Sequence, residues 1–503
     1  MHDVLTAQVS GCQQLQSALT GSFERYGYIP IALPLVEHSE LYLRRSGENI
    51  ISQMYEFQHR GRRLCLRPEM TASTMRAYIE HLQGASLPVR LYYTGPVFRH
   101  NGPSRGAHRQ FTQVGLELIG ADGALADGEV IRAAGAALEA AGLSSYSLLL
   151  GHVGILSAFL NRLDIDGQLR SFLLLNMETL RQRGEGYVAE RLSELYPAFR
   201  RPSAPDGPAA SGGEHLFHAL RGVPAGEARE LIVELLESLS LKLDENRDRD
   251  EVAERLLTKL RRGDQTAALD TALEFMARLG QLKGQPAAVL AECDRLLRHY
   301  HMNNPVTEYI SRLLSFLDTA GFPADRISLD LGISLGFQYY TGMIFEIHHT
   351  AAGGSVQLCG GGRYDDLIGL LGGRQPQPAT GFSFGLETVY SALQVEKGLN
   401  TASDGGYAPQ IFVTGVDQAS LPDAVRAAET VRADGWRAEL GLCPRTPADS
   451  LLYARGRHIP LAVLINSADH LPATVHDLST GQQHALRLDD LLHTLRSIGC
   501  QHA

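Results

Sequence analysis

The sequence is poor in cysteine and has none in pairs. Its six cysteines lie far apart and form no Cys-x-x-Cys motif: Cys12, Cys65, Cys293, Cys359, Cys443 and Cys500. Such scattering excludes a zinc ribbon and a disulfide framework, and it favours a reducing compartment. We therefore expect no metal centre and no disulfide bonds.

A targeting segment and a long hydrophobic run are also lacking. The first residues, Met1–Leu5, contain no basic segment followed by an apolar stretch, which argues against secretion. The longest uncharged stretch, residues 140–161, is interrupted by glycines, serines and His152. It predicts a buried strand, a turn and a helix rather than a membrane span. We expect a cytoplasmic protein with no membrane partner.

Positive charge is in deficit. Lys and Arg number 46 against 56 Asp and Glu, which gives a net charge of -10. No global positive field draws the chain to nucleic acid, so any such contact must be local. With 44% hydrophobic and 20% charged residues, the composition is that of a globular protein. A length of 503 residues is enough for two or three domains.

Residues 1–161 have an α+β pattern. Apolar residues at helical spacing predict a helix over residues 13–26. The proline-bounded segment 28–36 predicts a strand. Further short strands are predicted at residues 63–67, 89–93 and 111–119. The separations between these strands favour an antiparallel sheet with interposed helices.

Residues 162–305 lose the strand signal and show helical periodicity, which predicts a helical insertion. Within it, residues 201–213 predict a surface loop, and the charge run 244–251 predicts a solvated turn and helix start. Strand signals return from Ile327. Residues 306–395 therefore complete the sheet of the first domain and end in a helix over 387–395.

The last part of the chain predicts a separate domain. A polar, glycine-containing stretch at residues 396–408 predicts a linker. Residues 409–503 then alternate strands and helices, which predicts a small parallel α/β domain. Its predicted strands are residues 410–414, 437–440 and 461–465, and its predicted helices are residues 421–434 and 448–455.

Residues 93–117 predict a hairpin that could hold an anion. Arg99 ends one strand, a loop runs to Arg109, and the returning strand alternates so that Gln113 and Glu117 share a face. A buried glutamine and carboxylate on one face would suit an ammonium or imidazole ligand. The other reading is that both residues lie on a solvated face.

Two more segments carry polar groups beside predicted strands. Glu69 and Thr71 follow one strand, and Tyr339 and Tyr340 precede another. The glycine-rich stretch 359–366 allows close approach of a ligand to the backbone. Its spacing matches neither the Rossmann nor the P-loop pattern.

In their order these elements resemble the class II aminoacyl-tRNA synthetases, and specifically the histidyl-tRNA synthetase family. The resemblance covers nearly the whole chain. Segments similar to the three class motifs are residues 13–36 with Pro34, 98–111 and 379–387. Segments similar to the histidine-specific stretches are residues 336–341 and 361–365. The anticodon-binding domain is resembled by residues 409–503, with 475–482 near their end.

The resemblance implies a class II antiparallel sheet flanked by helices, with a helical insertion and a C-terminal α/β anticodon-binding-like domain. It implies a homodimer formed through residues 13–36. It also implies a histidine pocket, with Glu69, Thr71 and Gln113 for the ammonium group, Glu117 and Tyr339 for the imidazole, and Tyr340 and Tyr364 as lining. The nucleotide-binding candidates are Arg99, Arg105 and Arg109.

The sequence departs from the family at positions that handle phosphate. Leu335 stands where the family motif Arg-Gly-Leu-Asp-Tyr-Tyr has its arginine, and Gln338 stands at its aspartate. Thr388 replaces the arginine that ends the third motif, and residues 101–107 lack a glutamate and two arginines of the family loop. Adenylation needs preplaced cations and Mg²⁺, and loss of one such donor typically lowers the rate roughly 10²- to 10³-fold. We expect no intact catalytic set and inefficient adenylation.

Three functions are consistent with this pattern. The first is a paralogue that binds histidine without efficient catalysis and acts as a regulatory subunit. The enzyme that it would regulate is ATP phosphoribosyltransferase, with whose catalytic subunit it would form a heteromer. The stretches 150–154 and 339–342 resemble that regulatory subunit, although it usually lacks the C-terminal domain. The second is an active, divergent histidine–tRNA ligase that uses ATP and Mg²⁺. The third is a non-catalytic protein that binds tRNA through residues 409–503, where arginines could form a patch or merely solvate helices.

Overall fold

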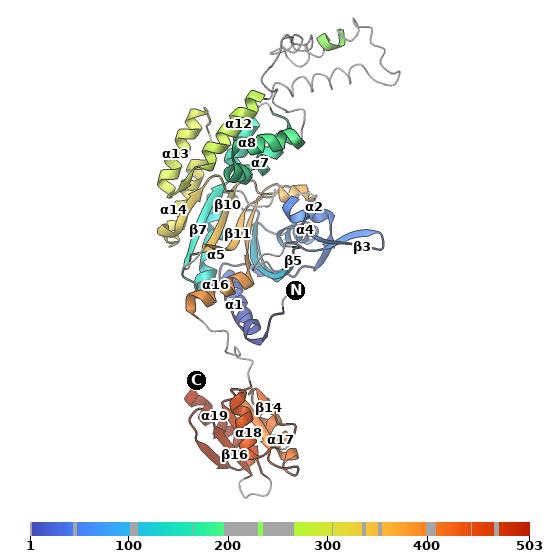
Figure 1. Cartoon of the computed structure of the whole chain (residues 1–503), viewed down its shortest axis with the longest axis vertical. Helices are drawn as coiled ribbons and strands as arrows, with labels where there is room; N and C mark the ends of the chain where they lie inside the picture. The colour runs from blue at the N-terminus through green and yellow to red at the C-terminus, as the bar shows by residue number, and fades with distance from the viewer. Residues whose placement is uncertain are drawn as a thin grey trace. The chain divides into compact units, whose positions relative to one another are not determined.

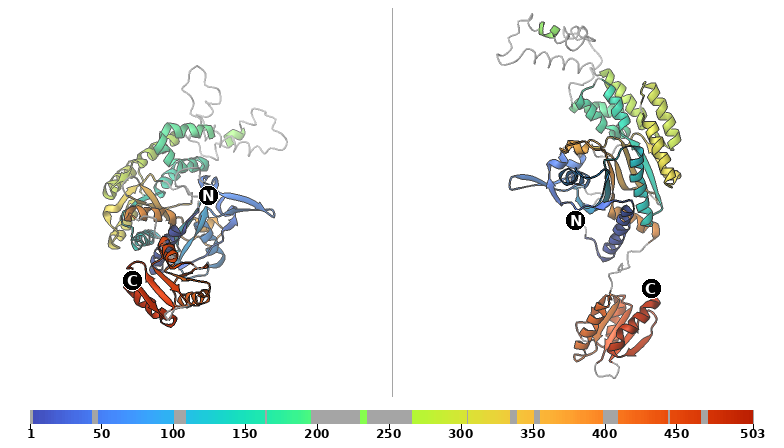
Figure 2. Two further views of the ribbon diagram at one scale, coloured as in Figure 1. Left: turned by 60° about the horizontal axis from the view of Figure 1, so that its bottom comes forward. Right: turned by 180° about the vertical axis from the view of Figure 1, so that it is seen from behind.

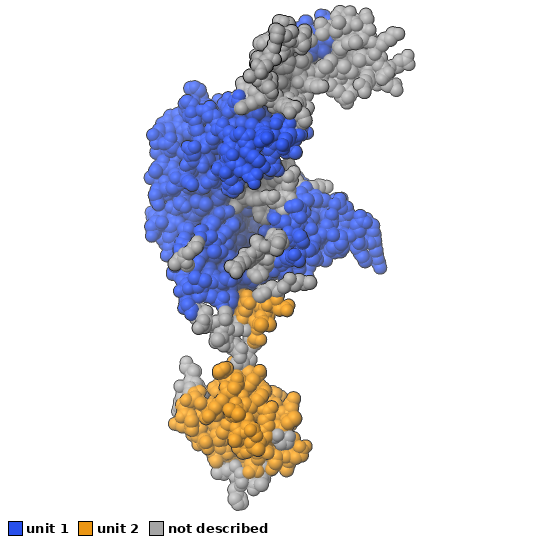
Figure 3. Space-filling model, in the orientation of Figure 1, with its two compact units in different colours: residues 1, 15–398 blue, residues 2–14, 399–503 orange. Residues whose placement is uncertain are grey.

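The computed structural model describes residues 3–43, 48–100, 109–163, 165–195, 230–234, 266–303, 305–333, 339–350, 355–398, 409–443, 445–466 and 472–502. The chain forms two compact units (Figure 3). The first consists mainly of Leu15–Gly398, and the second of Leu399–Ala503 together with His2–Gln14. The sequence pattern predicts residues 2–14 to be part of the first domain, whereas they group with the second unit.

The first unit is built on one large mixed sheet, in the order β1-β5-β6-β12-β11-β10-β7-β9-β8 (Figure 1). The strands are β1 (Ile29–Pro30), β5 (Val89–Phe98), β6 (Gln110–Ile119), β7 (Tyr146–His152), β8 (Lys283–Gly284), β9 (Ile327–Asp330), β10 (Met343–His349), β11 (Val356–Arg363) and β12 (Ala379–Gly385). From β5 to β7 all neighbours are antiparallel. The predicted antiparallel sheet flanked by helices is therefore confirmed.

Helices and a small sheet surround this large sheet. Besides α6 (Gly154–Arg162), which leads into the insertion, the described helices around the sheet are α1 (Thr6–Arg25), α2 (Glu40–Leu43), α3 (Glu48–Ile51), α4 (Thr71–His81), α5 (Gly123–Ala140), α14 (Val306–Thr319), α15 (Leu367–Leu370) and α16 (Leu386–Lys397), with a 3-10 turn at Ala324–Arg326. The small sheet has the order β2 (Val36–His38), β4 (Arg62–Leu66), β3 (Tyr55–His59). Helix α5 packs against both α14 and the large sheet.

The single strand predicted at residues 28–36 is wrong, because only its two ends pair with neighbouring strands. Ile29–Pro30 joins the large sheet, and Val36 begins a strand of the small one. Between them, the Arg67 guanidinium donates to the carbonyl oxygens of Leu33 at 2.8 Å and Pro34 at 3.1 Å. A side chain thus takes the acceptors that a strand ladder would use, and Pro34 offers no N–H.

The described part of the insertion is helical. It follows α6 (Gly154–Arg162) and contains α7 (Gly167–Leu175), α8 (Met177–Leu195), α12 (Thr266–Gly280) and α13 (Pro286–His299). Helices α7, α8 and α12 gather at one end of the first unit (Figures 1 and 2). The insertion also adds strand β8 to the large sheet, paired with β9. The predicted loop 201–213 and charge run 244–251 lie outside the described residues.

The second unit contains a sheet of order β14-β13-β15-β16-β17. Its elements are β13 (Ile411–Gly415), α17 (Leu421–Ala433), β14 (Ala438–Leu440), α18 (Pro447–Gly456), β15 (Leu461–Ile465), β16 (Ala473–Asp477), β17 (Gln483–Leu486), a 3-10 turn (Leu488–Asp490) and α19 (Leu491–His502). β13, β14 and β15 are parallel, as predicted, but β16 and β17 are antiparallel additions. The connection from β15 to β16 is too short for the crossover that a parallel pair requires. None of the described helices is long and apolar enough to cross a membrane.

Candidate functional site

Two carboxylates are buried side by side with hydroxyl and amide groups in the first unit. Glu69 lies between β4 and α4, and its oxygens accept from the backbone N–H of Ala72 at 3.1 and 3.2 Å. Glu117 lies on β6, where it accepts from the hydroxyl of Tyr93 at 3.0 Å and from that of Tyr364. The exposed fractions of Glu69 and Glu117 are 2% and 0%.

Burial makes both carboxylates reluctant to ionise. It raises the pKa of Glu69 to about 7, although hydrogen bonds from the start of α4 and the charge of Arg99 oppose the shift. It also raises the pKa of Glu117 well above its usual range; the hydroxyls of Thr71 and Tyr93 oppose this, and the charge of Glu69 adds to it. A cationic ligand in this place would relieve the unfavourable charge, because an opposite charge favours the ionised form. A buried pair of carboxyl groups of this kind therefore suits a cationic ligand.

The amide of Gln113 is fixed in orientation from both sides. Its oxygen accepts from the backbone N–H of Met70 at 3.1 Å, and its nitrogen donates to the hydroxyl of Ser383 at 3.1 Å. Gln113 and Glu117 are both buried on the same face of β6. Of the two readings of this strand, the solvated face is wrong.

Three tyrosines pack together beside the carboxylates. The ring centres of Tyr339 and Tyr340 lie 4.9 Å apart, and the ring of Tyr364 lies 5.5 and 6.2 Å from them. Burial raises the pKa of Tyr339 well above its usual range, so this phenol stays neutral and can donate a hydrogen bond. The cluster supplies aromatic faces and O–H groups at one place, a combination that suits an imidazole ring.

Arg99 lies close enough to this group for Glu69, Tyr339 and Tyr340 to act on it electrostatically. Its Nε donates to the carbonyl oxygen of Pro68 at 2.8 Å, and its guanidinium carbon lies 5.2 Å from the ring centre of Phe111. Burial lowers the pKa of Arg99, and the charge of Glu69 opposes this shift. Arg99 thus supports the loop that carries Glu69.

The other positions that the sequence associates with nucleotide binding are placed differently. Arg109 is exposed just before β6, and the structure does not bring it to the carboxylates. Thr388 lies in the first turn of α16, beside Gly385. Arg105 and Leu335 lie outside the described residues. No group of three or more His, Cys, Asp or Glu side chains that could hold a metal ion occurs in the described part of the chain.

Sequence reasoning missed two residues that complete the site. Tyr93 and Ser383 both stand opposite Gly115 in the sheet, one on β5 and the other on β12. The sequence predicts the strand that contains Tyr93, and alternation along it predicts the face on which Tyr93 lies. Alternation does not predict which strands are its neighbours in the sheet. Gly115 leaves the space between them, because an added Cβ would lie 2.8 Å from the Tyr93 hydroxyl and 2.9 Å from the Ser383 Cβ.

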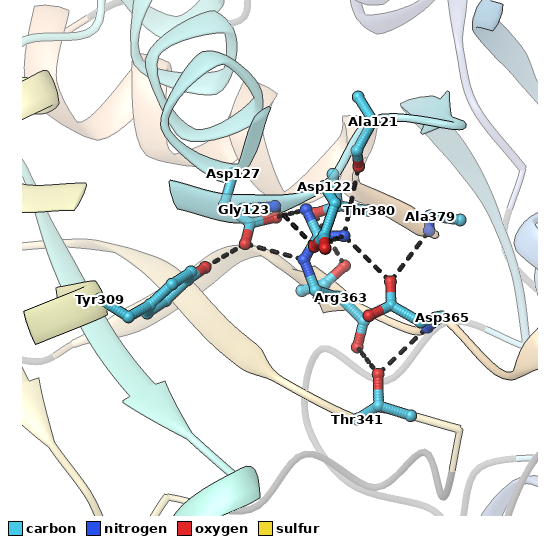
Figure 4. A network of polar contacts seen from close by, with 11 residues as sticks. Ala121, Asp122, Gly123, Asp127, Tyr309, Thr341, Arg363, Asp365, Ala379 and Thr380 are labelled. Atoms are coloured by element: carbon cyan, nitrogen blue, oxygen red, sulfur yellow. Dashed lines mark hydrogen bonds and ion pairs between the residues drawn. The ribbon is translucent and has the colours of Figure 1, made fainter. Parts of the chain in front are cut away.

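A second network, drawn in Figure 4, includes Thr341 and Arg363, which are next in sequence to Tyr340 and Tyr364. The guanidinium of Arg363, at the end of β11, donates to both carboxylate oxygens of Asp127 at 2.8 and 2.9 Å. It also donates to Asp365 at 2.9 Å, and the hydroxyl of Tyr309 donates to Asp127. The Thr341 hydroxyl accepts from the backbone N–H of Asp365 at 3.1 Å. Sequence reasoning gave no role to Asp127 or Tyr309.

Comparison with known proteins agrees with these features. A family model described as Histidyl-tRNA synthetase matches residues 1–194 and 228–389. A histidine–tRNA ligase of Pyrococcus furiosus is 28% identical over 480 residues, which cover 94% of this chain and 92% of that protein. One from Methanocaldococcus jannaschii is 28% identical over 497 residues, which cover 97% and 96%.

Two solved structures share the fold. An apo histidyl-tRNA synthetase of S. aureus superposes with a TM-score of 0.62 at 22% identity, covering 98% of this chain and 97% of that one. An ATP phosphoribosyltransferase regulatory subunit/histidyl-tRNA synthetase from Bacillus halodurans has a TM-score of 0.60 at 24% identity, covering 91% and 94%. At this level of identity both demonstrate a common fold.

Proposed function

The chain belongs to the histidyl-tRNA synthetase family, and we propose that it binds histidine without activating it efficiently and acts as a regulatory subunit. The observation that carries the proposal is a contrast between two sets of residues, those expected to bind histidine and those expected to bind ATP. The groups suited to histidine are gathered and buried, whereas positions at which the family places arginines hold Leu335 and Thr388.

The gathered groups match the chemistry of histidine. The amino acid has a cationic ammonium group, and Glu69 supplies a carboxylate whose charge the burial disfavours until a cation arrives. The imidazole of histidine would face Glu117. That carboxyl receives hydrogen bonds from two phenols and can accept a further one from an imidazole N–H. Gln113 is held by Met70 and Ser383, so its amide is preorganised rather than free to rotate.

The groups suited to ATP are incomplete. In-line attack on a phosphate builds negative charge that fixed cations must stabilise. Neither leucine nor threonine carries that charge, so two of the cations that the family uses are missing. The residues present fit an amino acid better than a triphosphate.

A regulatory role gives such a pocket a use. A subunit that binds histidine and performs no chemistry can report the concentration of histidine to an enzyme that makes it. ATP phosphoribosyltransferase, the first enzyme of histidine biosynthesis, is the proposed target, and the fold shared with the Bacillus halodurans protein supports this choice. We further propose a homodimer through residues 13–36 that assembles with the catalytic subunit.

A second candidate, an active histidine–tRNA ligase, is favoured by a different observation. The relatives from Pyrococcus furiosus and Methanocaldococcus jannaschii carry that name and align over almost the full chain, the second unit included. In that case ATP and Mg²⁺ would be required, and cationic residues elsewhere in the chain would have to serve the phosphates in place of the uncharged Leu335 and Thr388.

Histidine-dependent exchange of labelled pyrophosphate into ATP separates the two candidates. The purified chain should show no exchange beside an intact histidyl-tRNA synthetase as positive control, while calorimetry detects histidine binding to the same sample. The double variant Leu335→Arg, Thr388→Arg is a gain-of-function control and should raise exchange above the background. Robust exchange by the natural chain would overturn the proposal in favour of the ligase, and absence of histidine binding would overturn it altogether.

A further inference from the structure

The segment that carries the pocket tyrosines is flanked on one side by contacts to the helical insertion and on the other by contacts to the helices that border the insertion. The chain reaches Tyr339 nine residues after Asp330, the last residue of β9. On the other side, Thr341 and Gly342 precede β10. In sequence, Tyr340 adjoins the second flank directly, and Tyr339 follows Asp330 by a short connection.

The first flank is held by an ion pair with the insertion. Nη2 of Arg181, on α8, lies 2.9 Å from Oδ2 of Asp330, and the two side chains are only 20% and 10% exposed. The other oxygen of Asp330 accepts from the backbone N–H of Gly332 at 3.0 Å. One carboxylate thus joins helix α8 to the start of the segment.

Backbone contacts reinforce this junction. Asp330 pairs with Lys283 of β8, and the N–H of Leu331 donates to the carbonyl oxygen of Leu282 at 3.0 Å. A Cβ added to Gly332 would lie 2.6 Å from the Cα of Gly280, at the end of α12. Residues 330–332 and the insertion therefore touch without intervening side chains, so a shift of the insertion displaces these three residues.

The second flank is held by the helices through which the chain enters and leaves the insertion. The N–H of Val153, just before α6, donates to the carbonyl oxygen of Gly342 at 3.0 Å. Helix α14, which follows the insertion, contributes Tyr309 to the Asp127–Arg363 network (Figure 4). That network reaches Thr341 through Asp365. Both ends of the tyrosine segment are thus tied to the insertion or its borders.

We propose that Arg181 and Asp330 are positioning residues of the histidine pocket, and that through this ion pair the helical insertion sets the pocket's affinity for histidine. The inference rests on the proposed histidine binding and assigns a role to the insertion, for which the sequence offered none. Because coupling between two sites is reciprocal, histidine must in turn stabilise the insertion against opening.

Two substitutions and a matched control test the pair. Arg181→Met keeps the aliphatic stem and removes the charge, and Asp330→Asn keeps an acceptor for the Gly332 N–H. The control is Arg278→Met on α12, whose ion pair with Glu274 spans 2.7 Å within one helix and is about half exposed. By calorimetry, each of the first two variants should weaken histidine binding roughly 5-fold or more, and the double variant no further. Arg278→Met should bind as the natural chain does.

Hydrogen exchange supplies a readout that a merely structural role would not change. Histidine should slow exchange in peptides covering α8 and α12 of the natural chain and of Arg278→Met, but not of Arg181→Met. Thermal melting without histidine shows whether each variant folds. If Arg181→Met does not fold, the exchange experiment uses Asp330→Asn in its place. Unchanged affinity and protection in both variants of the pair would overturn the inference while leaving histidine binding intact. A natural chain that binds no histidine would overturn the proposed function and the inference with it.

Discussion

Gly381 and Glu117 stand opposite each other in the antiparallel pair of β12 and β6, and the carboxylate of Glu117 fills the space that a side chain at position 381 would occupy. A Cβ on Gly381 would also lie 2.5 Å from the Leu116 carbonyl oxygen and 2.7 Å from the Tyr364 hydroxyl. The buried carboxylate can therefore keep its place between two phenols only because residue 381 has no side chain.

Gly381→Ala should displace Glu117 and abolish the pocket. We expect histidine binding to weaken more than about tenfold and the free energy of unfolding to fall by about 1–3 kcal/mol, as for other overpacked cores. Gly369→Ala is the matched control, since its nearest neighbour would be the Pro376 Cβ at an ordinary 3.9 Å. Calorimetry and chemical denaturation measure both effects. Normal histidine binding by Gly381→Ala would mean that Glu117 is not part of the pocket.

The raised pKa of Glu69 predicts how the stability of the free protein depends on pH. The folded-state value of about 7 lies above the ordinary 4.5, so the folded chain holds more protons than the unfolded one between these values. This contribution is fully present below pH 4.5 and is lost as pH rises to 7, by on the order of 3 kcal/mol at most. Glu69→Gln should remove that part of the slope, which denaturation at several pH values would detect. An unchanged slope would contradict it.

The same carboxyl predicts proton release on histidine binding. A bound ammonium group favours the ionised form of Glu69 and lowers its pKa, so histidine should expel part of a proton near pH 7. Affinity should accordingly increase as pH rises towards 7. Titration calorimetry in buffers of different ionisation enthalpy measures the released protons directly. Glu69→Gln should bind more weakly and release none of them.

Two carboxylates of helix α5 form ion pairs with arginines of the sheet, and the two pairs differ in burial. We therefore expect them to contribute differently to the free energy of unfolding. Arg363 holds Asp127 of α5 with side chains 5% and 0% exposed, whereas Arg90 holds Glu129 of the same helix with 31% and 27% exposed. Arg363→Met leaves a buried carboxylate and should lower the free energy of unfolding by about 3–5 kcal/mol. Arg90→Met should lower it by about 1 kcal/mol or less. Equal losses in denaturant titrations would show that burial is not the deciding factor.

The second unit should bind tRNA only weakly. Residues 409–503 contain eight arginines, no lysine and ten acidic residues. Arg432 pairs with Glu429 at 2.6 Å and Arg457 with Glu439 at 3.4 Å, so part of the positive charge is neutralised. Anisotropy of labelled histidine tRNA with the full chain should give a Kd no tighter than roughly 10 µM at physiological salt. Tight binding with a steep salt dependence would favour the two tRNA-dependent functions.

The predicted helices and strands agree with the structure wherever a local pattern decides them. Alternation placed Gln113 and Glu117 on one face of a strand that the structure contains as β6. Local pattern failed at residues 28–36, where the Arg67 side chain takes the acceptors, and at the end of the second unit, where a short connection imposes antiparallel pairing. In both places the outcome depends on residues that are remote in sequence or on chain connection.

Residue identity and short-range spacing were enough to predict the family, most helices and strands, and the absence of arginine at positions 335 and 388. Which faces are buried, and which side chains meet there, depends on packing between elements that are remote in sequence. Tyr93 reaches Glu117 across neighbouring strands, and Arg363 reaches Asp127 across 236 residues. Sheet order and helix packing create these contacts, and burial then shifts the carboxyl pKa values. Local sequence pattern encodes neither these long-range contacts nor the pKa shifts that follow from burial.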